Sequence, residues 1–131
     1  MIRLFNVGSK INFVDSENAF VGFDYESDCC ESFGWAIIMD RDERLLATDE
    51  EKFSDADLIF DTSVEPCPQD ELLKKVLLDR DYDMGGTMAF RVCDEYDFSD
   101  KGWLILYNCH NGYYSHGWEY GKLNVEKEGS L

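Results

Sequence analysis

The chain has 131 residues and carries 28 acidic against 12 basic side chains, which gives a formal net charge of −16. The electric field of such a surface repels DNA, RNA and anionic membranes, so we exclude direct nucleic-acid binding and membrane association. With 44% hydrophobic and 15% aromatic residues the chain can bury a core, and its length fits one acidic, β-rich domain spanning residues 1–131.

Cysteine usage and the N-terminal residues predict a cytoplasmic location. No apolar run approaches the roughly 20 residues that a membrane helix needs. The first residues lack the apolar core and small-residue cleavage site of a signal peptide. The cysteines are odd in number and lack the spacing of a disulfide framework, so we expect reduced thiols. They are Cys29, Cys30, Cys67, Cys93 and Cys109.

The first half of the chain predicts mainly strands. Residues 11–25 predict a hairpin, because two strand-like runs flank the polar turn Asp15–Asn18. Residues 33–39 are apolar at both alternating positions, which is typical of a central strand covered on both faces. Residues 40–57 are dense in charge and predict a loop or short irregular elements, and Asp57–Phe60 predicts a short strand.

One helix is predicted near residues 69–78. Pro68 suits its first turn, and the acidic residues at 70 and 71 suit the positive end of the helix dipole. Its single apolar face contains Leu72, Leu73, Val76 and Leu77. A loop over 79–86 and an alternating strand over 88–93 follow. That strand places Met88, Phe90 and Val92 on one face.

A second hairpin is predicted near the C-terminal end. Residues 103–110 and 113–120 are strand-like and are joined by Asn111-Gly112, the dipeptide that a two-residue type I′ turn prefers. Such a turn places His110 opposite Tyr113 and fixes the register of the strands. We expect the core face to carry Trp103, Ile105, Tyr107, Cys109, Tyr114, His116, Trp118 and Tyr120. We expect the other face, exposed and polar toward the turn, to carry Leu104, Leu106, Asn108, His110, Tyr113, Ser115, Gly117 and Glu119.

These elements together predict an α+β fold. Most of it is antiparallel β-sheet, with about six strands connected largely by hairpins, and the helix near residues 69–78 is its only helix.

Two segments supply a candidate polar site. In the segment Asp28-Cys29-Cys30-Glu31 a metal or redox centre competes with simple packing of one thiol in the core. Adjacent strand residues point to opposite faces and cannot easily share one metal. His110, at the turn, is the freer histidine for general acid–base chemistry. No sequence motif of a known catalytic site is present, so we assign no catalytic residue, metal ligand or cofactor. The candidate polar site consists of Asp28, Cys30, Glu31, Asn108, His110, Tyr113 and Ser115.

Two runs alternate acidic with aromatic side chains, and we interpret them as a candidate acidic partner surface. Such a surface attracts basic proteins, and its interleaved acids and rings imitate the phosphates and bases of a nucleic acid. The competing reading is solvated loops that only increase solubility. The spacing of an EF-hand loop is absent from both runs. The surface consists of Asp79, Asp81, Asp83, Asp94, Glu95, Asp97 and Asp100.

The segments Asp28-Cys29-Cys30-Glu31-Ser32 and Asn111-Gly112-Tyr113-Tyr114-Ser115 together resemble the signature segments of a family of small, uncharacterised domains from tailed phages and bacteria. That family ends its late strand with Ser-Asn-Gly-Tyr-Tyr-Ser, whereas Cys109-His110 precedes Asn111 here, and residues 40–87 do not align. The resemblance implies a phage, prophage or bacterial origin, a small mixed fold, and proximity of the two segments. It implies no biochemical activity.

Three hypotheses follow for function. The first is a non-enzymatic binding protein that docks on a basic host protein, in one form as a nucleic-acid mimic that inhibits it. The second is a small metal-dependent or hydrolytic enzyme that uses the segments Asp28–Glu31 and His110–Ser115. The third is a structural or assembly protein that forms homo-oligomers.

Overall fold

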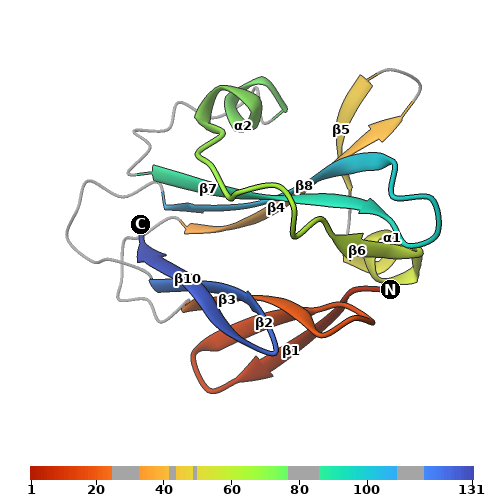
Figure 1. Cartoon of the computed structure of the whole chain (residues 1–131). Coiled ribbons are helices and arrows are strands. Elements are labelled where there is room, and N and C mark those ends of the chain that lie inside the picture. The colour runs from red at the N-terminus through yellow and green to blue at the C-terminus, as the bar shows by residue number, and fades with distance from the viewer. Residues whose placement is uncertain (25–32, 42–43, 49, 77–85, 109–116) are drawn as a thin grey trace.

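The structure is a computed structural model that describes residues 1–24, 33–41, 44–48, 50–76, 86–108 and 117–131. In this part of the chain it contains ten strands and two short helices, and every strand pairing is antiparallel (Figure 1). The prediction of a mainly antiparallel fold is therefore confirmed. The prediction of about six strands was too low.

The strands form two five-stranded sheets. The first sheet contains, in spatial order, β1 (Arg3–Val7), β2 (Lys10–Val14), β3 (Ala19–Asp24), β9 (Gly117–Lys122) and β10 (Asn124–Ser130). The second contains, in spatial order, β5 (Arg44–Thr48), β4 (Phe33–Arg41), β8 (Asp100–Asn108), β7 (Gly86–Asp94) and β6 (Leu58–Phe60). The helices are α1 (Glu50–Asp55) and α2 (Asp70–Val76).

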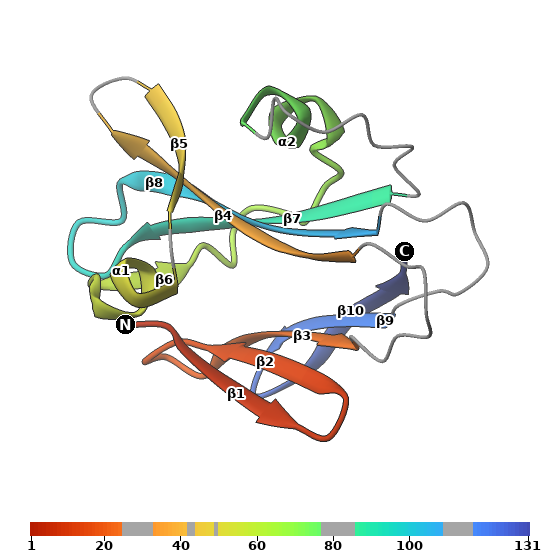
Figure 2. The ribbon, with the colours of Figure 1, turned by 180° about the vertical axis from the view of Figure 1, so that it is seen from behind.

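The two sheets pack face to face and enclose the main hydrophobic core (Figures 1 and 2). Aromatic rings connect the sheets edge to face. The ring centroids of Phe13 and Trp35 are 5.7 Å apart, and those of Phe90 and Trp118 are 5.6 Å apart. β2 therefore lies over β4, and β9 lies over β7.

The outer face of the second sheet has a smaller core of its own beneath α2. Side chains alternate along β4, so Ile37 lies in the main core while Ile38 packs with Leu73 of α2. The strand predicted over 33–39 is thus covered on both faces, as expected, although it is second in its sheet and not central.

Most of the predicted local elements are present. β2 and β3 form the first hairpin with its turn at Asp15–Asn18. β6 corresponds to the predicted short strand and β7 to the predicted alternating strand. Met88, Phe90 and Val92 share one face of β7, as predicted, and that face lies against the main core. α2 covers most of the predicted helix.

The prediction of a single helix was wrong, because the middle of the chain contains a second one. The segment 40–57, predicted as a loop or short irregular elements, contains β5 and α1, so the fold has a second helix. β5 pairs with the end of β4, with Ala47 opposite Ile38 and Arg44 opposite Arg41. This strand depends on backbone pairing with a neighbour, a factor that the local density of charge does not reveal.

The predicted pairing of 103–110 with 113–120 was also wrong, because β8 and β9 belong to different sheets. Leu106 of β8 lies opposite Trp35 and Met88, whereas Trp118 of β9 lies opposite Phe23 and Gly129. The segment 109–116, which contains the Asn-Gly pair, lies outside the described residues.

The change of sheet also reverses the predicted faces of β8. Leu104 and Leu106 point into the main core toward the sheet that carries Trp118 and Tyr120. Trp103, Ile105 and Tyr107 lie instead on the outer face, in the smaller core beneath α2.

Candidate functional site

The acidic run that connects β7 to β8, here called the 94–100 turn, is held by its own carboxylates. Oδ1 of Asp94 accepts hydrogen bonds from the backbone N–H groups of Tyr96 at 2.8 Å and Asp97 at 3.2 Å. The backbone of Asp94 also pairs with Ser99 and Phe98 across the turn. Asp94 therefore determines the conformation of the turn and also contributes a negative charge to it.

The later acids of the turn are fixed in the same way. Asp97 accepts hydrogen bonds from the backbone N–H of Ser99 at 2.8 Å and from its hydroxyl at 2.6 Å. These bonds hold the pKa of the Asp97 carboxyl below its usual value. Oδ1 of Asp100 lies 3.3 Å from Nε of Arg91, whose guanidinium stacks on the Trp103 ring at 4.7 Å.

Two aromatic side chains project from this acidic turn. Tyr96 is 73% exposed and Phe98 is 62% exposed. Phe98 has a φ of 61°, in the left-handed region that a bulky side chain rarely adopts. The charges of Asp57 and Glu95 raise the pKa of the Tyr96 hydroxyl above its usual value.

The 94–100 turn packs against two other connections at one end of the sandwich. The backbone N–H of Glu95 donates to the carbonyl of Asp57 at 2.9 Å, between α1 and β6. The Oε1 atom of Glu95 accepts a hydrogen bond of 2.5 Å from the hydroxyl of Ser16, in the turn between β2 and β3. Three loops therefore meet there.

Of the predicted acidic partner surface, the structure places four residues on the 94–100 turn, with Asp57 beside them. These are Asp94, Glu95, Asp97 and Asp100. The other three, Asp79, Asp81 and Asp83, lie outside the described residues, as do most members of the candidate polar site: Asp28, Cys30, Glu31, His110, Tyr113 and Ser115.

Asn108, the described member of the candidate polar site, is not exposed as expected. It is 2% exposed, and its Nδ2 donates to the carbonyl of Leu131 at 3.2 Å. The reason is the reversed faces of β8, which turn Asn108 inward with Leu104 and Leu106. Asn108 thus connects the end of β8 to the residue that follows β10.

The two described cysteines, Cys67 and Cys93, are free thiols. Cys93 is buried. Its burial, and to a smaller extent the charge of Asp61, raises the pKa of its thiol to about 11. Cys67 is half-buried, and Nε2 of Gln69 lies 3.5 Å from its sulfur. Among the residues that the structure describes, no group of three or more potential ligands is arranged to hold a metal ion.

The sequence did not reveal a hollow on the outer face of the first sheet. Nζ of Lys10 lies 2.5 Å from Oε2 of Glu119, and the lysine passes over Gly22 on the strand between them. A hollow of about 410 Å³ adjoins this ion pair, with Gly117 and Ser130 in its wall. The pair joins residues 109 positions apart, so no local pattern indicates it. One signal was available: residues 1–14 contain none of the chain's acids.

No family model, curated protein or solved structure matches the chain. None of the helices formed by the described residues has the length and apolar character to cross a membrane.

Proposed function

We propose that this protein is a non-enzymatic binding protein whose 94–100 turn docks on a protein partner with a basic surface. The observation that carries the proposal is the exposure of Tyr96 and Phe98 on a turn whose carboxylates are fixed by hydrogen bonds. Exposed rings on a backbone that hydrogen bonds hold in place lose less conformational freedom on binding than rings on a loose loop, and aromatic side chains are common anchors at interfaces.

The backbone of Phe98 supports the same proposal. A phenylalanine in the left-handed region costs free energy and buries little apolar surface at this position. Residues with strain of this kind cluster at functional sites in proteins. Contact of the ring with a partner provides such a reason.

The proposed partner is a nucleic-acid-handling protein, which the turn would engage as a mimic. Acids interleaved with rings resemble the phosphates and bases that a basic groove accepts. The net charge of −16 steers the protein toward such grooves. The family resemblance of the segments Asp28–Ser32 and Asn111–Ser115 adds a phage or prophage origin to the proposal, which makes the partner a bacterial host protein.

The test uses a double variant that keeps the charge of the turn. Immobilised parent and Y96S/F98S proteins are exposed to bacterial lysate in about 50 mM salt, and captured proteins are released with a salt step. The matched control is F5S/V7S, which removes two exposed apolar side chains on β1. We expect basic proteins on the parent and the control but not on Y96S/F98S, with release by salt or by added duplex DNA. Equal capture by Y96S/F98S would refute the proposal.

A further inference from the structure

The outer face of the first sheet differs in charge from the rest of the molecule. Side chains alternate along the strands, and Phe13, Val21 and Tyr120 point into the core, so their strand neighbours point outward. One outward row crosses all five strands through paired positions. It consists of Phe5, Asn12, Gly22, Glu119 and Glu128.

This face is divided into two halves of opposite charge. β1 and β2 point Arg3 and Lys10 outward and contain no acidic residue. The carboxylates at paired outward positions of this sheet lie on the other half, and they are Asp24 of β3, Glu119 of β9 and Glu128 of β10. The net charge of the face is therefore close to neutral, in a chain whose net charge is −16.

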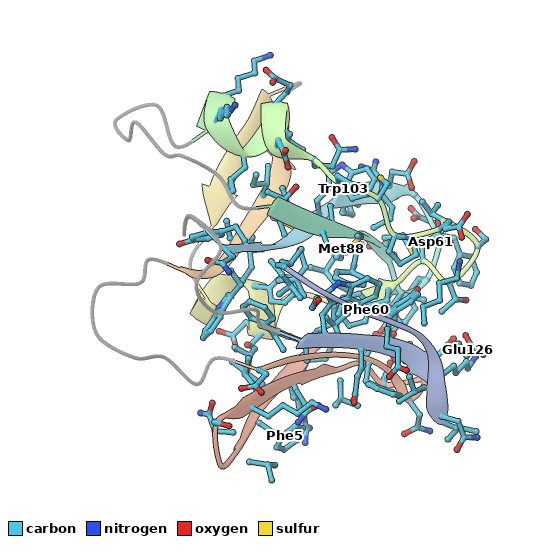
Figure 3. The ribbon with its side chains drawn as sticks, turned by 90° about the vertical axis from the view of Figure 1, so that its left-hand side faces the viewer. Phe5, Phe60, Asp61, Met88, Trp103 and Glu126 are labelled. Atoms are coloured by element: carbon cyan, nitrogen blue, oxygen red, sulfur yellow. The ribbon has the colours of Figure 1, made fainter. Side chains whose placement is uncertain are left out.

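The two halves also differ in shape. On the basic half, Phe5 is 50% exposed and Val7 is 66% exposed, and Figure 3 shows Phe5 pointing away from the core that contains Phe60. The hollow of about 410 Å³ borders Lys10 and extends over the acidic half, where Gly117, Glu128 and Ser130 line it. Protruding apolar side chains and a hollow thus occur on the same face.

We propose that this face binds a second copy of the chain around a two-fold axis that runs parallel to the strands and over β3. That axis places β1 and β2 of one copy on β10 and β9 of the other, so Val7 and Phe5 enter the partner's hollow and basic halves meet acidic halves. An axis across the strands would instead place like charges on each other.

The size of the face sets the strength of the contact. Five strands about 4.8 Å apart, each contributing five residues of about 3.3 Å, give a flat area of roughly 400 Å² per copy. Stable interfaces bury about 800 Å² per partner. We therefore expect a weak dimer that forms at high protein concentration and dissociates on dilution.

The experiment measures mass in solution and tests the orientation. Sedimentation velocity from about 5 µM to 1 mM, in about 150 mM salt, should show the average mass rising from 15.2 kDa toward twice that value. V7D places a carboxylate on the partner's acidic half and should abolish association, whereas V7K should preserve or strengthen it. Y96D and Y96K make the same charge changes on the 94–100 turn, and both should associate like the parent.

Each alternative outcome overturns the proposal. A mass of 15.2 kDa at every concentration would show that no dimer forms. Masses that grow beyond the dimer would show that the contact is not closed by a two-fold axis. If V7D associates as strongly as the parent, this face is not the interface. If V7D and V7K lose association equally, opposed charges do not determine how the two copies pack. Thermal unfolding of each variant verifies that it is folded. The partner-capture proposal depends on the rings of Tyr96 and Phe98, and the dimer proposal depends on Val7, so either proposal can fail while the other holds.

Discussion

The carboxylate of Asp15 accepts a hydrogen bond from the backbone N–H of Phe60 at 2.9 Å, and so joins the turn after β2 to a strand of the other sheet. Its other oxygen accepts from the N–H groups of Glu17 and Ala19, each at 2.9 Å. Asp15 is buried, and all three of these donors are backbone groups. A single acidic side chain thus fixes a tight turn and the separation of two sheets.

Replacing Asp15 with Asn should destabilise the protein by about 1–3 kcal/mol, because the amide NH₂ cannot accept a hydrogen bond and one buried N–H group loses its partner. Urea denaturation of D15N and of the parent measures the difference. E17Q is the matched control, since it removes the same charge at an exposed side chain whose ion pair with Lys122 is 3.6 Å long. A change in D15N no larger than in E17Q would show that the Asp15 bonds are dispensable.

Gly129 lies against the indole of Trp118, and this contact leads to a second prediction. A Cβ atom at 129 would be 2.8 to 2.9 Å from three atoms of the indole ring, which packs on Phe90 in the core. G129A should therefore cost about 1–3 kcal/mol of unfolding free energy by overpacking. At Gly117 the nearest described atom to a Cβ is the carbonyl oxygen of Gly129, 3.8 Å away, so G117A serves as the control. Equal stability of the two variants would contradict the prediction.

Elements with a complete local signal were predictable from the sequence. The run 88–93 alternates, and the hairpin around Asp15–Asn18 has strands on both sides of a polar turn. The pairing of β8 was not predictable from the sequence. Asn111-Gly112 indicates a hairpin between sequence neighbours, whereas the partners of Leu106 come from β4 and β7. Burial of Asn108 is a consequence of that choice of sheet.

The candidate sites also differ in whether their residues are close together in the sequence. The 94–100 turn was identified because its acids and rings are adjacent in sequence, and its hydrogen bonds are also local. The ion pair between Lys10 and Glu119 depends on two strand registers, β2 with β3 and β3 with β9. Pattern along a single chain does not specify which strands become neighbours.

The thiol of Cys93 and the hydroxyl of Tyr120, both buried in the core, should make the stability of the protein sensitive to alkaline pH. Burial raises the pKa of Cys93 from 9.0 to about 11 and that of Tyr120 from 10.0 to about 12. Above pH 9 the unfolded chain therefore loses these protons before the folded chain does, so stability should fall as pH rises through 9 to 12 and be unaffected by these groups below pH 9.

Denaturation curves between pH 8 and 11.5 measure this loss. The C93A variant is less stable overall, but it should show a shallower decline between pH 9 and 11, because one of the two groups is gone. Native Cys93 should also react slowly with a thiol reagent at pH 8, where it is protonated and buried. An identical pH slope in C93A and the parent would assign the alkaline sensitivity elsewhere.

The left-handed backbone of Phe98 predicts a trade between stability and binding. Asparagine adopts positive φ at lower cost than phenylalanine, so F98N should stabilise the protein by about 1 kcal/mol. The same change removes one of the two exposed rings of the 94–100 turn and should weaken capture of the basic partner. Y96N removes the other ring, whose backbone φ is not positive, and should weaken capture without stabilising. Denaturation and the capture assay, applied to both variants, separate the two effects. If F98N is stabilised and still captures the partner as the parent does, the strain at Phe98 has no part in binding.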